Sequence, residues 1–386
     1  MSAAVSRAFG APFRYVQGPG EIRNLPAHVA PYGRKVLAAV DPYLFPRLGP
    51  ELRDIFAGSG TEIAAVPFGG ECTEDEVARL AGLAKSLGSR VVCGLGGGKT
   101  LDAAKLAGAD LKLPVVIVPT SASTDAPVSA MGVLYRPDGR HLRCRTFDHA
   151  PELVVVDSEI VARAPLRLFV AGIGDALSTW PEAEACLASG TPNYVGRGYG
   201  QSLAGGAVAA KCHEIVLGKA TAAVADLSRG LLTEAVEDVI EANILLSGLG
   251  FENNGCAAAH ALHTGIHELE GSGALYHGEV VAFGVLFQLV LERRPPNVTG
   301  RLIDFLSSLG LPVSFRDMGL KTDDGSLALV AGRIMDGGSG VTAEPFAVTR
   351  ETVLEALVKA DRLGRHWRAS RPELPEPYCL RGRGPA

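Results

Sequence analysis

The chain has 386 residues, about two to three times the length of a typical domain, which predicts two domains. Its 37 basic and 42 acidic residues give a net charge of −5 without a dense basic run, which argues against a nucleic-acid or membrane-surface partner. Seven scattered cysteines without a C-x-x-C pair suggest neither a zinc ribbon nor a disulfide framework. Neither a signal peptide nor an apolar stretch of bilayer length is visible, so we expect a cytoplasmic protein.

The first half of the chain alternates short β-branched runs with helical patterns. Strands are predicted at residues 35–40, 62–66, 90–93, 113–118 and 153–157, and helices at residues 77–87 and 99–108. The fourth of these strands is nearly all apolar, as expected for a strand that is buried on both faces. Strands that alternate with helices predict a mostly parallel sheet with helices on both of its faces.

From about residue 165 the β-branched runs give way to helical spacing. A helical 4-3-4-3 spacing joins Leu232, Val236, Val239, Asn243 and Leu246, and a shorter helical run follows at residues 353–358. The sequence therefore predicts an α/β domain at residues 1–164 and an all-α domain at residues 165–386. We expect the active site in the cleft between the two domains.

A glycine loop, Gly96, Gly97 and Gly98, joins the third strand to a helix that begins Lys-Thr-Leu-Asp. Bare backbone N–H groups and the positive end of a helix dipole meet there, which suits a diphosphate. A Walker A motif would need glycine where Cys93 stands, and a Rossmann fingerprint would need a third glycine where Lys99 stands. The alternative interpretation is a tight strand-to-helix turn without a ligand.

Two further features follow predicted strands. Asp41 follows the first strand at the edge where open α/β sheets bind ligands, so its carboxylate is suited to hold a ribose hydroxyl and to repel the extra phosphate of NADP. The polar run Thr120-Ser-Ala-Ser-Thr-Asp125 lies between Pro119 and Pro127 and is suited to line a cleft. Each also has a plain interpretation, as a turn before Pro42 and as a solvated loop.

Histidines cluster in the second half. His260, His263 and His267 are spaced to share one face of a helix, and His277 opens another apolar run after a break at glycine and serine. Two imidazoles from successive elements plus a carboxylate would make a three-ligand catalytic zinc site, although the spacing does not say which two histidines bind. The carboxylate candidate is Asp175, which otherwise reads as a simple helix cap.

Four segments occur together in one order: Gly-Gly-Gly-Lys-Thr-Leu-Asp, Ala-Ser-Thr-Asp-Ala-Pro, Gly-Ile-Gly-Asp-Ala-Leu and His-Ala-Leu-His…His-Gly-Glu. Their combination resembles the glycerol dehydrogenases, within the metal-dependent (iron-containing type) alcohol dehydrogenase superfamily. The resemblance runs from about residue 15 to about residue 365. It implies an N-terminal Rossmann-like dinucleotide-binding domain and a helical C-terminal domain, and it implies NAD-dependent, zinc-assisted oxidation of glycerol or a similar small 1,2-diol to the hydroxyketone by hydride transfer.

The resemblance also assigns residues. It places one zinc ion per subunit on Asp175, His260 and His277, and a polyol contact on Asp125. His263 would orient the nicotinamide or relay a proton, unless it only packs. Family members commonly form homo-oligomers such as octamers. The NAD site would be formed by the glycine loop Gly96, Gly97 and Gly98 together with Asp41, Lys99, Thr120, Ser123, Ser129, Met131 and Tyr135.

The sequence departs from the family pattern at several positions. The iron-dependent branch carries a further histidine one turn after the aspartate, where this chain has Thr179, and this favours the three-ligand zinc site. Pro181 replaces a residue that is usually aromatic, so we expect a kink in the helix after Asp175. Arg143 and Arg145 lie in a stretch that is usually more apolar.

Three rival functions remain. The first is a superfamily enzyme for a phosphorylated substrate, similar to glycerol-1-phosphate dehydrogenase or dehydroquinate synthase, which would need basic residues at the pocket; only Arg143 and Arg145 offer them. The second is a nucleotide-dependent phosphotransferase or ATPase that uses the glycine loop, against which Cys93 argues. The third is a catalytically dead binding protein, which the intact metal positions disfavour.

Overall fold

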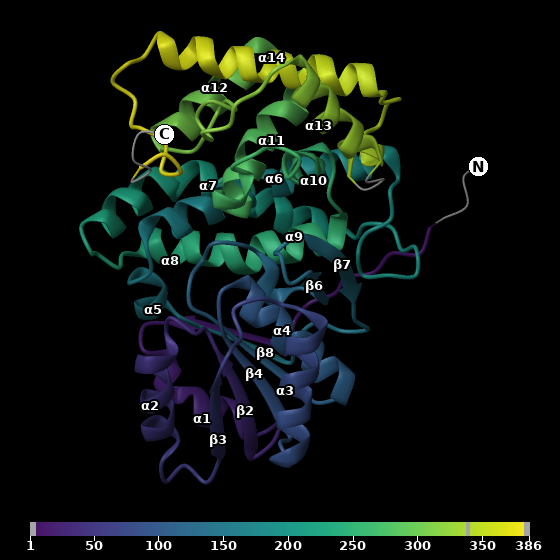
Figure 1. Cartoon of the computed structure of the whole chain (residues 1–386). Helices are drawn as coiled ribbons and strands as arrows, with labels where there is room; N and C mark the ends of the chain where they lie inside the picture. The colour runs from purple at the N-terminus through teal and green to yellow at the C-terminus, as the bar shows by residue number, and fades with distance from the viewer. Residues whose placement is uncertain (1–4, 337–339, 382–386) are drawn as a thin grey trace. The chain divides into compact units, whose positions relative to one another are not determined.

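The computed structural model describes residues 5–336 and 340–381 (Figure 1). The chain divides into two compact units, Gly10–Ala164 and Pro165–Ala386, and the second also includes Met1–Phe9. In this second unit Arg7 forms an isolated parallel bridge with Gly200, and the side-chain amide of Asn193 donates to the carbonyl of Ala8 at 3.1 Å. The cleft that the sequence predicts for the active site stays a prediction.

The unit Gly10–Ala164 is built on a six-stranded sheet in which all neighbouring strands are parallel, as predicted. Its strands, in spatial order, are β1 (Arg14–Gly18), β8 (Leu153–Asp157), β5 (Val115–Pro119), β4 (Val91–Gly96), β2 (Lys35–Val40) and β3 (Glu62–Pro67). Edge strand β1 was not among the strands predicted from composition, nor was the antiparallel hairpin of β6 (Met131–Tyr135) and β7 (His141–Thr146). Both β1 and β7 are partly or largely exposed, so neither carries an apolar run.

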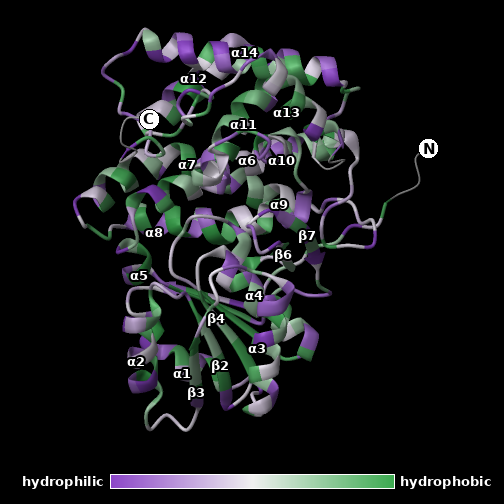
Figure 2. Cartoon of the chain, in the orientation of Figure 1, coloured by the Kyte–Doolittle hydropathy of each residue, from purple (hydrophilic) through white to green (hydrophobic). Residues whose placement is uncertain are grey.

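Helices cover both faces of this sheet. They are α1 (Leu25–Val29), α2 (Phe45–Phe56), α3 (Glu74–Ser86), α4 (Gly98–Leu111) and α5 (Ser158–Ala162). Alternate strand residues such as Val36 and Val116 form one apolar core with side chains of α1 and α2, including Leu25 and Leu52. Helices α3 and α4 contact each other, and both contact central strands of the sheet. Figure 2 shows the apolar strands in green between these helices.

The carboxyl ends of β2, β4 and β5 meet at one edge of the sheet. Val40 pairs with Leu95, and Gly96 pairs with Pro119, so the residues that follow these strands are neighbours. The chain leaves β2 toward β3 on one side, whereas β4 lies on the other side of β2. This reversal is a topological switch point, where open α/β sheets bind their ligands.

Within its described residues the second unit is helical and has no β-ladder beyond the bridge at Arg7, as predicted. Its helices are α6 (Leu166–Ser189), α7 (Leu203–Ser228), α8 (Glu234–Glu241), a π-helical turn (Ala242–Leu246), α9 (Ser247–Asn254), α10 (Ala258–Ile266), α11 (His277–Leu291), α12 (Pro296–Ser308), α13 (Asp324–Asp336) and α14 (Arg350–Ala369). The predicted apolar spacing before Leu246 falls on α8 and the π-helical turn. No described helix is long and apolar enough to cross a membrane.

Helix α11 is the centre of this unit. All its residues after His277 are buried, and it contacts α6, α10, α12 and α14. Two glycines allow its backbone to touch neighbouring helices. A Cβ added at Gly278 would lie 1.8 Å from the Ala171 carbonyl oxygen of α6, and one added at Gly284 would lie 2.2 Å from the Ala259 carbonyl oxygen of α10. Any larger residue at these positions would force the helices apart.

Helix α6 continues through Pro181 to Ser189. Proline has no N–H group, so it cannot bond to the carbonyl of Leu177 four residues earlier. The Pro181 carbonyl accepts a hydrogen bond from the Gln288 side chain of α11 at 3.2 Å. A neighbouring helix therefore satisfies part of the backbone around the proline.

We predict that Gly278→Ala lowers the free energy of unfolding by about 1–3 kcal/mol or more, because the new methyl group meets a backbone carbonyl that cannot rotate away. Gly218→Ala is the matched control. Gly218 is exposed on α7 and has open space around it, so the same change should stabilise the helix by about 0.5–1 kcal/mol. Chemical denaturation of both variants measures the difference. Equal stability of the two would contradict the close packing of α6 and α11.

Candidate active site

The second unit brings together one carboxylate and two imidazoles. Asp175 lies within α6, His260 on α10, and His277 is the first residue of α11. The Nε2 atoms of His260 and His277 lie 3.4 and 3.3 Å from Asp175 Oδ1, and the donor atoms of all three residues lie within 4.8 Å of one another. The carboxylate is fully buried, whereas the imidazoles are 19% and 31% exposed. Asp175 is therefore not a helix cap but an internal residue of a buried helix.

The close approach of α6 and α11 explains this meeting. A Cβ added at Gly174 would lie 2.3 Å from the carbonyl oxygen of Gly278. Gly174 directly precedes Asp175, and Gly278 directly follows His277. The two helices therefore touch beside the point where the Asp175 and His277 side chains meet. The glycine before Asp175 therefore packs directly against the backbone of Gly278.

The electrostatics of the cluster favour a cation. Burial raises the pKa of Asp175, but the neighbouring His277 and His260 hold it well below its ordinary value. Burial lowers the pKa of His260, but Cys256 and Glu182 beside it raise that pKa well above its ordinary value. Without a metal ion, protons supply the positive charge that the buried carboxylate requires. One carboxylate and two imidazole nitrogens fit the donor set of a catalytic zinc site.

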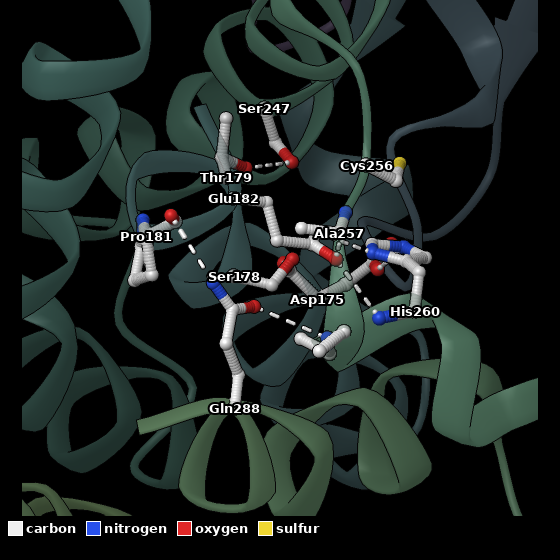
Figure 3. Close-up of polar contacts among 12 residues, drawn as sticks. Asp175, Ser178, Thr179, Pro181, Glu182, Ser247, Cys256, Ala257, His260 and Gln288 are labelled. Atoms are coloured by element: carbon white, nitrogen blue, oxygen red, sulfur yellow. Dashed lines mark hydrogen bonds and ion pairs between the residues drawn. The ribbon is translucent and has the colours of Figure 1, made fainter. Parts of the chain in front are cut away.

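A second potential ligand set shares His260 with the first. Glu182, Cys256 and His260 also offer atoms within 4.8 Å of one another. Glu182, however, already accepts three hydrogen bonds, from Ala257 N at 2.8 Å, His260 N at 2.9 Å and His260 Nδ1 at 2.6 Å (Figure 3). Its oxygens are committed to these donors, so we favour the Asp175 set.

The other two histidines of the cluster lie beside the first set. The ring of His263 lies 4.4 Å from that of His277 and 4.6 Å from that of His267, measured between centroids. Burial and the neighbouring His277 hold the pKa of His263 well below its ordinary value. His267 follows the end of α10 and is exposed. Of the three histidines His260, His263 and His267, the candidate set therefore includes His260 alone.

The first residues of α10 are held by side chains that the sequence did not point to. The residue before this helix, Ala257, has no capping side chain. Besides Glu182, Glu344 Oε1 accepts from Ala258 N at 3.2 Å, and Gln288 Oε1 accepts from Ala259 N at 3.1 Å. These acceptors come from three different parts of the chain, so no local motif announces them.

The predicted cofactor residues of the first unit gather at the switch point. Asp41 directly follows β2, and its Oδ1 accepts from Tyr43 N at 3.0 Å. A Cβ added at Gly96 would lie 2.7 Å from the Thr100 side chain and 3.1 Å from Cβ of Asp41, so Asp41 lies against the glycine loop. A Cβ at Gly97 would meet nothing within 4 Å. Gly97 is also the N-cap of α4, and no side chain at this position caps the first N–H groups of the helix.

The polar loop after β5 approaches the same edge. Thr120 N donates to the Gly96 carbonyl at 3.1 Å. Ser123 Oγ lies 3.1 Å from Ser121 Oγ, and the buried Asp125 precedes a 3-10 turn, Ala126–Val128. The structure thus brings Asp41, the glycine loop and Thr120 together.

Lys99 contacts another predicted cofactor residue. Its Nζ lies 2.6 Å from Glu71 Oε2 and 4.9 Å from the ring centroid of Tyr135. Burial and nearby acidic groups raise the pKa of Tyr135 well above its ordinary value, so its phenol stays neutral.

A buried ion pair supports the rest of this loop. Lys105 is 2% exposed, and its Nζ lies 2.9 Å from Asp102 Oδ1. The same ammonium donates to the carbonyls of Ala126, at 2.9 Å, and Met131. These carbonyls flank Ser129, whose hydroxyl donates to Ala126 O at 3.1 Å. In the sequence, these contacts are indicated only by Asp102 and Lys105, an acidic and a basic residue that lie one turn apart in the helix after the glycine loop.

Comparison with known proteins identifies the family. A family model described as iron-containing alcohol dehydrogenase matches residues 12–158. A glycerol dehydrogenase of Thermotoga maritima is 43% identical over 92% of this chain and 96% of its own length. The crystal structure of glycerol dehydrogenase from Schizosaccharomyces pombe aligns with a TM-score of 0.93 at 32% identity, over 98% of this chain and 96% of that chain. The chain belongs to the glycerol dehydrogenase family.

One similar protein has a name that states a different substrate. A glycolaldehyde reductase of Halobacterium salinarum is 37% identical over 94% of this chain and 100% of its own length. The family is therefore shared by proteins whose names state different substrates. Family membership alone does not fix the substrate, which depends on the residues of the active site.

The presence of Thr179 in place of the further histidine of the iron-dependent branch has a structural explanation. In this family member Thr179, one turn after Asp175, is buried and its Oγ1 lies 2.9 Å from Ser247 Oγ of α9 (Figure 3). A Cβ added at Gly250 would lie 2.2 Å from Thr179 Cγ2, so a side chain larger than threonine meets the backbone of α9. A fourth ligand at this position is therefore absent, and its place is filled by helix packing.

The two arginines that the phosphorylated-substrate rival needs are paired on the surface. Arg143 lies 2.6 Å from Glu74 Oε1, and Arg145 lies 2.6 Å from Asp110 Oδ1. Both lie on the exposed strand β7. In this glycerol dehydrogenase family member their guanidinium groups thus have carboxylate partners.

Proposed function

We propose that this chain catalyses the NAD-dependent, metal-assisted oxidation of glycerol, or of a similar small 1,2-diol, to the hydroxyketone. With glycerol the product is dihydroxyacetone. The observation that carries the proposal is the meeting of the buried Asp175 with His260 and His277 in a member of the glycerol dehydrogenase family. Three such ligands with a fourth position for substrate are the pattern of catalytic zinc sites.

We propose that the metal is zinc, one ion per subunit. When bound, a divalent ion there supplies Lewis acidity that lowers the pKa of a diol hydroxyl. Asp175 provides the negative charge that balances the cation, and the two imidazoles provide neutral donors. Thr179 in place of a fourth imidazole supports zinc over iron, because it leaves the three-ligand set of a catalytic zinc site.

For the cofactor we propose NAD, which accepts the hydride at C4 of its nicotinamide. The open backbone at Gly97 and the free N–H groups of α4 are suited to the diphosphate. Asp41 is oriented by Tyr43 N and is suited to accept hydrogen bonds from the adenine ribose. We propose that the remaining cofactor contacts come from Gly96, Gly98, Lys99, Thr120, Ser123, Ser129, Met131 and Tyr135.

For the substrate we propose that Asp125 accepts a hydrogen bond from a diol hydroxyl that the metal does not hold. A buried carboxylate also disfavours an anionic substrate, since like charges repel in a partly dry site. Together with the paired Arg143 and Arg145, this argues against a phosphorylated polyol. The proposed roles of His263, in nicotinamide orientation, proton relay or packing, stay predictions, as do a homo-oligomer such as an octamer and a cytoplasmic location.

Metal removal tests the first part of the proposal. We expect a chelator to abolish NADH formation from glycerol and added zinc to restore it. His277→Ala should lower kcat by several orders of magnitude and lose bound metal, as measured by elemental analysis. The exposed His366 on α14 offers a control, since His366→Ala should keep both activity and metal. Full activity of verified metal-free His277→Ala protein would overturn the metal assignment.

Cofactor preference tests the position of Asp41. We expect kcat/KM to be clearly higher with NAD than with NADP, because the carboxylate repels a 2′-phosphate. Asp41→Ser should narrow this ratio, whereas Asp54→Ser on the exposed surface of α2 should leave it unchanged. A wild-type enzyme that prefers NADP would show that Asp41 does not contact the ribose.

Substrate comparison tests the role of Asp125. We expect kcat/KM for glycerol and 1,2-propanediol to exceed that for ethanol and for glycerol 1-phosphate. Asp125→Ala should mainly raise KM for the diol, and Asp125→Asn, which keeps the shape and one acceptor, should have a smaller effect. Steady-state kinetics with the four substrates measures this order of kcat/KM. A clear preference for the phosphate ester would promote the phosphorylated-substrate alternative.

A further inference from the structure

Glu182 connects the candidate metal ligand His260 to a second helix. It lies on α6 two turns after Asp175 and is 1% exposed. One oxygen, Oε1, accepts the backbone N–H groups of Ala257 and His260, and the other, Oε2, lies 2.6 Å from His260 Nδ1 (Figure 3). A carboxylate only accepts hydrogen bonds, so Nδ1 carries the proton in this contact. The lone pair available for a cation is then on Nε2, the atom nearest Asp175.

We propose that Glu182 is a positioning residue that prepares His260 to bind the metal ion, by holding the ring proton on Nδ1 and fixing the ring toward Asp175 and His277. The inference rests on the metal site of the proposed function. A carboxylate behind a metal-binding imidazole orients the ring and makes it a stronger ligand. The direction of α10 assists, because its positive N-terminal end stabilises the buried negative charge of Glu182.

The imidazole contact is separable from helix capping. The N–H groups of Ala258 and Ala259 are capped by Glu344 and Gln288, so α10 keeps two anchors that do not involve Glu182. By contrast, the described contacts of His260 Nδ1 include no other carboxylate within hydrogen-bond distance. Loss of Glu182 Oε2 should therefore affect the ligand more than the helix.

A glutamine at position 182 cannot satisfy all three donors. Its side chain has one acceptor oxygen and one NH₂ donor, whereas Glu182 accepts on both oxygens. With the oxygen on the two backbone N–H groups, the NH₂ group faces Nδ1 and drives the ring proton to Nε2, where it competes with the cation. With the oxygen on Nδ1, the NH₂ group opposes the backbone donors and weakens the helix start. A loss of metal affinity therefore reports the first orientation of the amide, and a loss of stability reports the second.

The test compares Glu182→Gln with wild type as metal-free, full-length protein titrated with Co²⁺ and with Zn²⁺ in competition with a chelator. We expect the dissociation constant of each ion to rise about 10–100-fold, with little change in the Tm of the metal-free protein. Glu184→Gln is the matched control: Glu184 lies on the same helix, is 43% exposed and pairs with Arg294 at 3.5 Å, so its metal affinity should equal that of wild type. Unchanged affinity of Glu182→Gln at an unchanged Tm would overturn the proposal. Unchanged affinity at a lower Tm would mean that the glutamine oxygen has kept the contact with Nδ1, and Glu182→Ala, which has no acceptor, then decides: an unchanged dissociation constant for Glu182→Ala would reduce Glu182 to a helix cap and overturn the proposal.

A measurement on the wild type keeps the inference testable if Glu182→Gln fails to fold. In the Co²⁺-loaded protein, the ring N–H of His260 should give a hyperfine-shifted proton signal that exchanges slowly with water, because it is hydrogen-bonded to the buried carboxylate of Glu182. Rapid exchange of this signal would overturn the role of Glu182. A wild-type protein that binds neither Co²⁺ nor Zn²⁺ would overturn the proposed function as well, so the two failures are distinguishable.

Discussion

The candidate metal site depends on the direct backbone contact between α6 and α11. Gly278 cannot carry a Cβ because the Ala171 carbonyl occupies that space, and Gly174 is restricted in the same way by Gly278. Helices that lack side chains at their contact approach more closely than ordinary packing allows. As a result the fully buried Asp175 comes within 3.3 Å of the His277 ring, at the point where α11 begins.

Charge follows from that geometry. A carboxylate that is removed from water needs compensation, and the ion-pair partners of Asp175 among the described residues are the imidazoles of His260 and His277. Imidazoles can release their protons to make room for a cation, whereas arginine cannot. Such rings suit the metal site proposed above, and on the far side of the His260 ring Glu182 Oε2 lies 2.6 Å from Nδ1.

Glycines also shape the candidate cofactor site of the first unit. The diphosphate site proposed above needs backbone donors without side chains in the way, and glycines stand at the end of β4 and the start of α4. Gly96 has no room for a side chain beside Thr100 and Asp41, while Gly97 faces open space. The buried Lys105 then ties α4 to the Ala126–Val128 turn, so the loop that follows β5 is anchored to the helix that begins at the glycines.

The sequence alone predicted the parallel α/β unit and the helical unit, because apolar periodicity is a local signal. The spacing of the histidines left open which rings join Asp175, and only the resemblance to the glycerol dehydrogenases named His260 and His277. The tertiary structure brings these two rings to the carboxylate, because α6, α10 and the start of α11 pack together. It also supplied the supporting residues Glu182, Gln288 and Glu344, which lie far apart in the chain and cap a helix that has no cap of its own. A polar side chain that acts on a distant backbone N–H leaves no periodic pattern, and therefore only the folded chain identifies it.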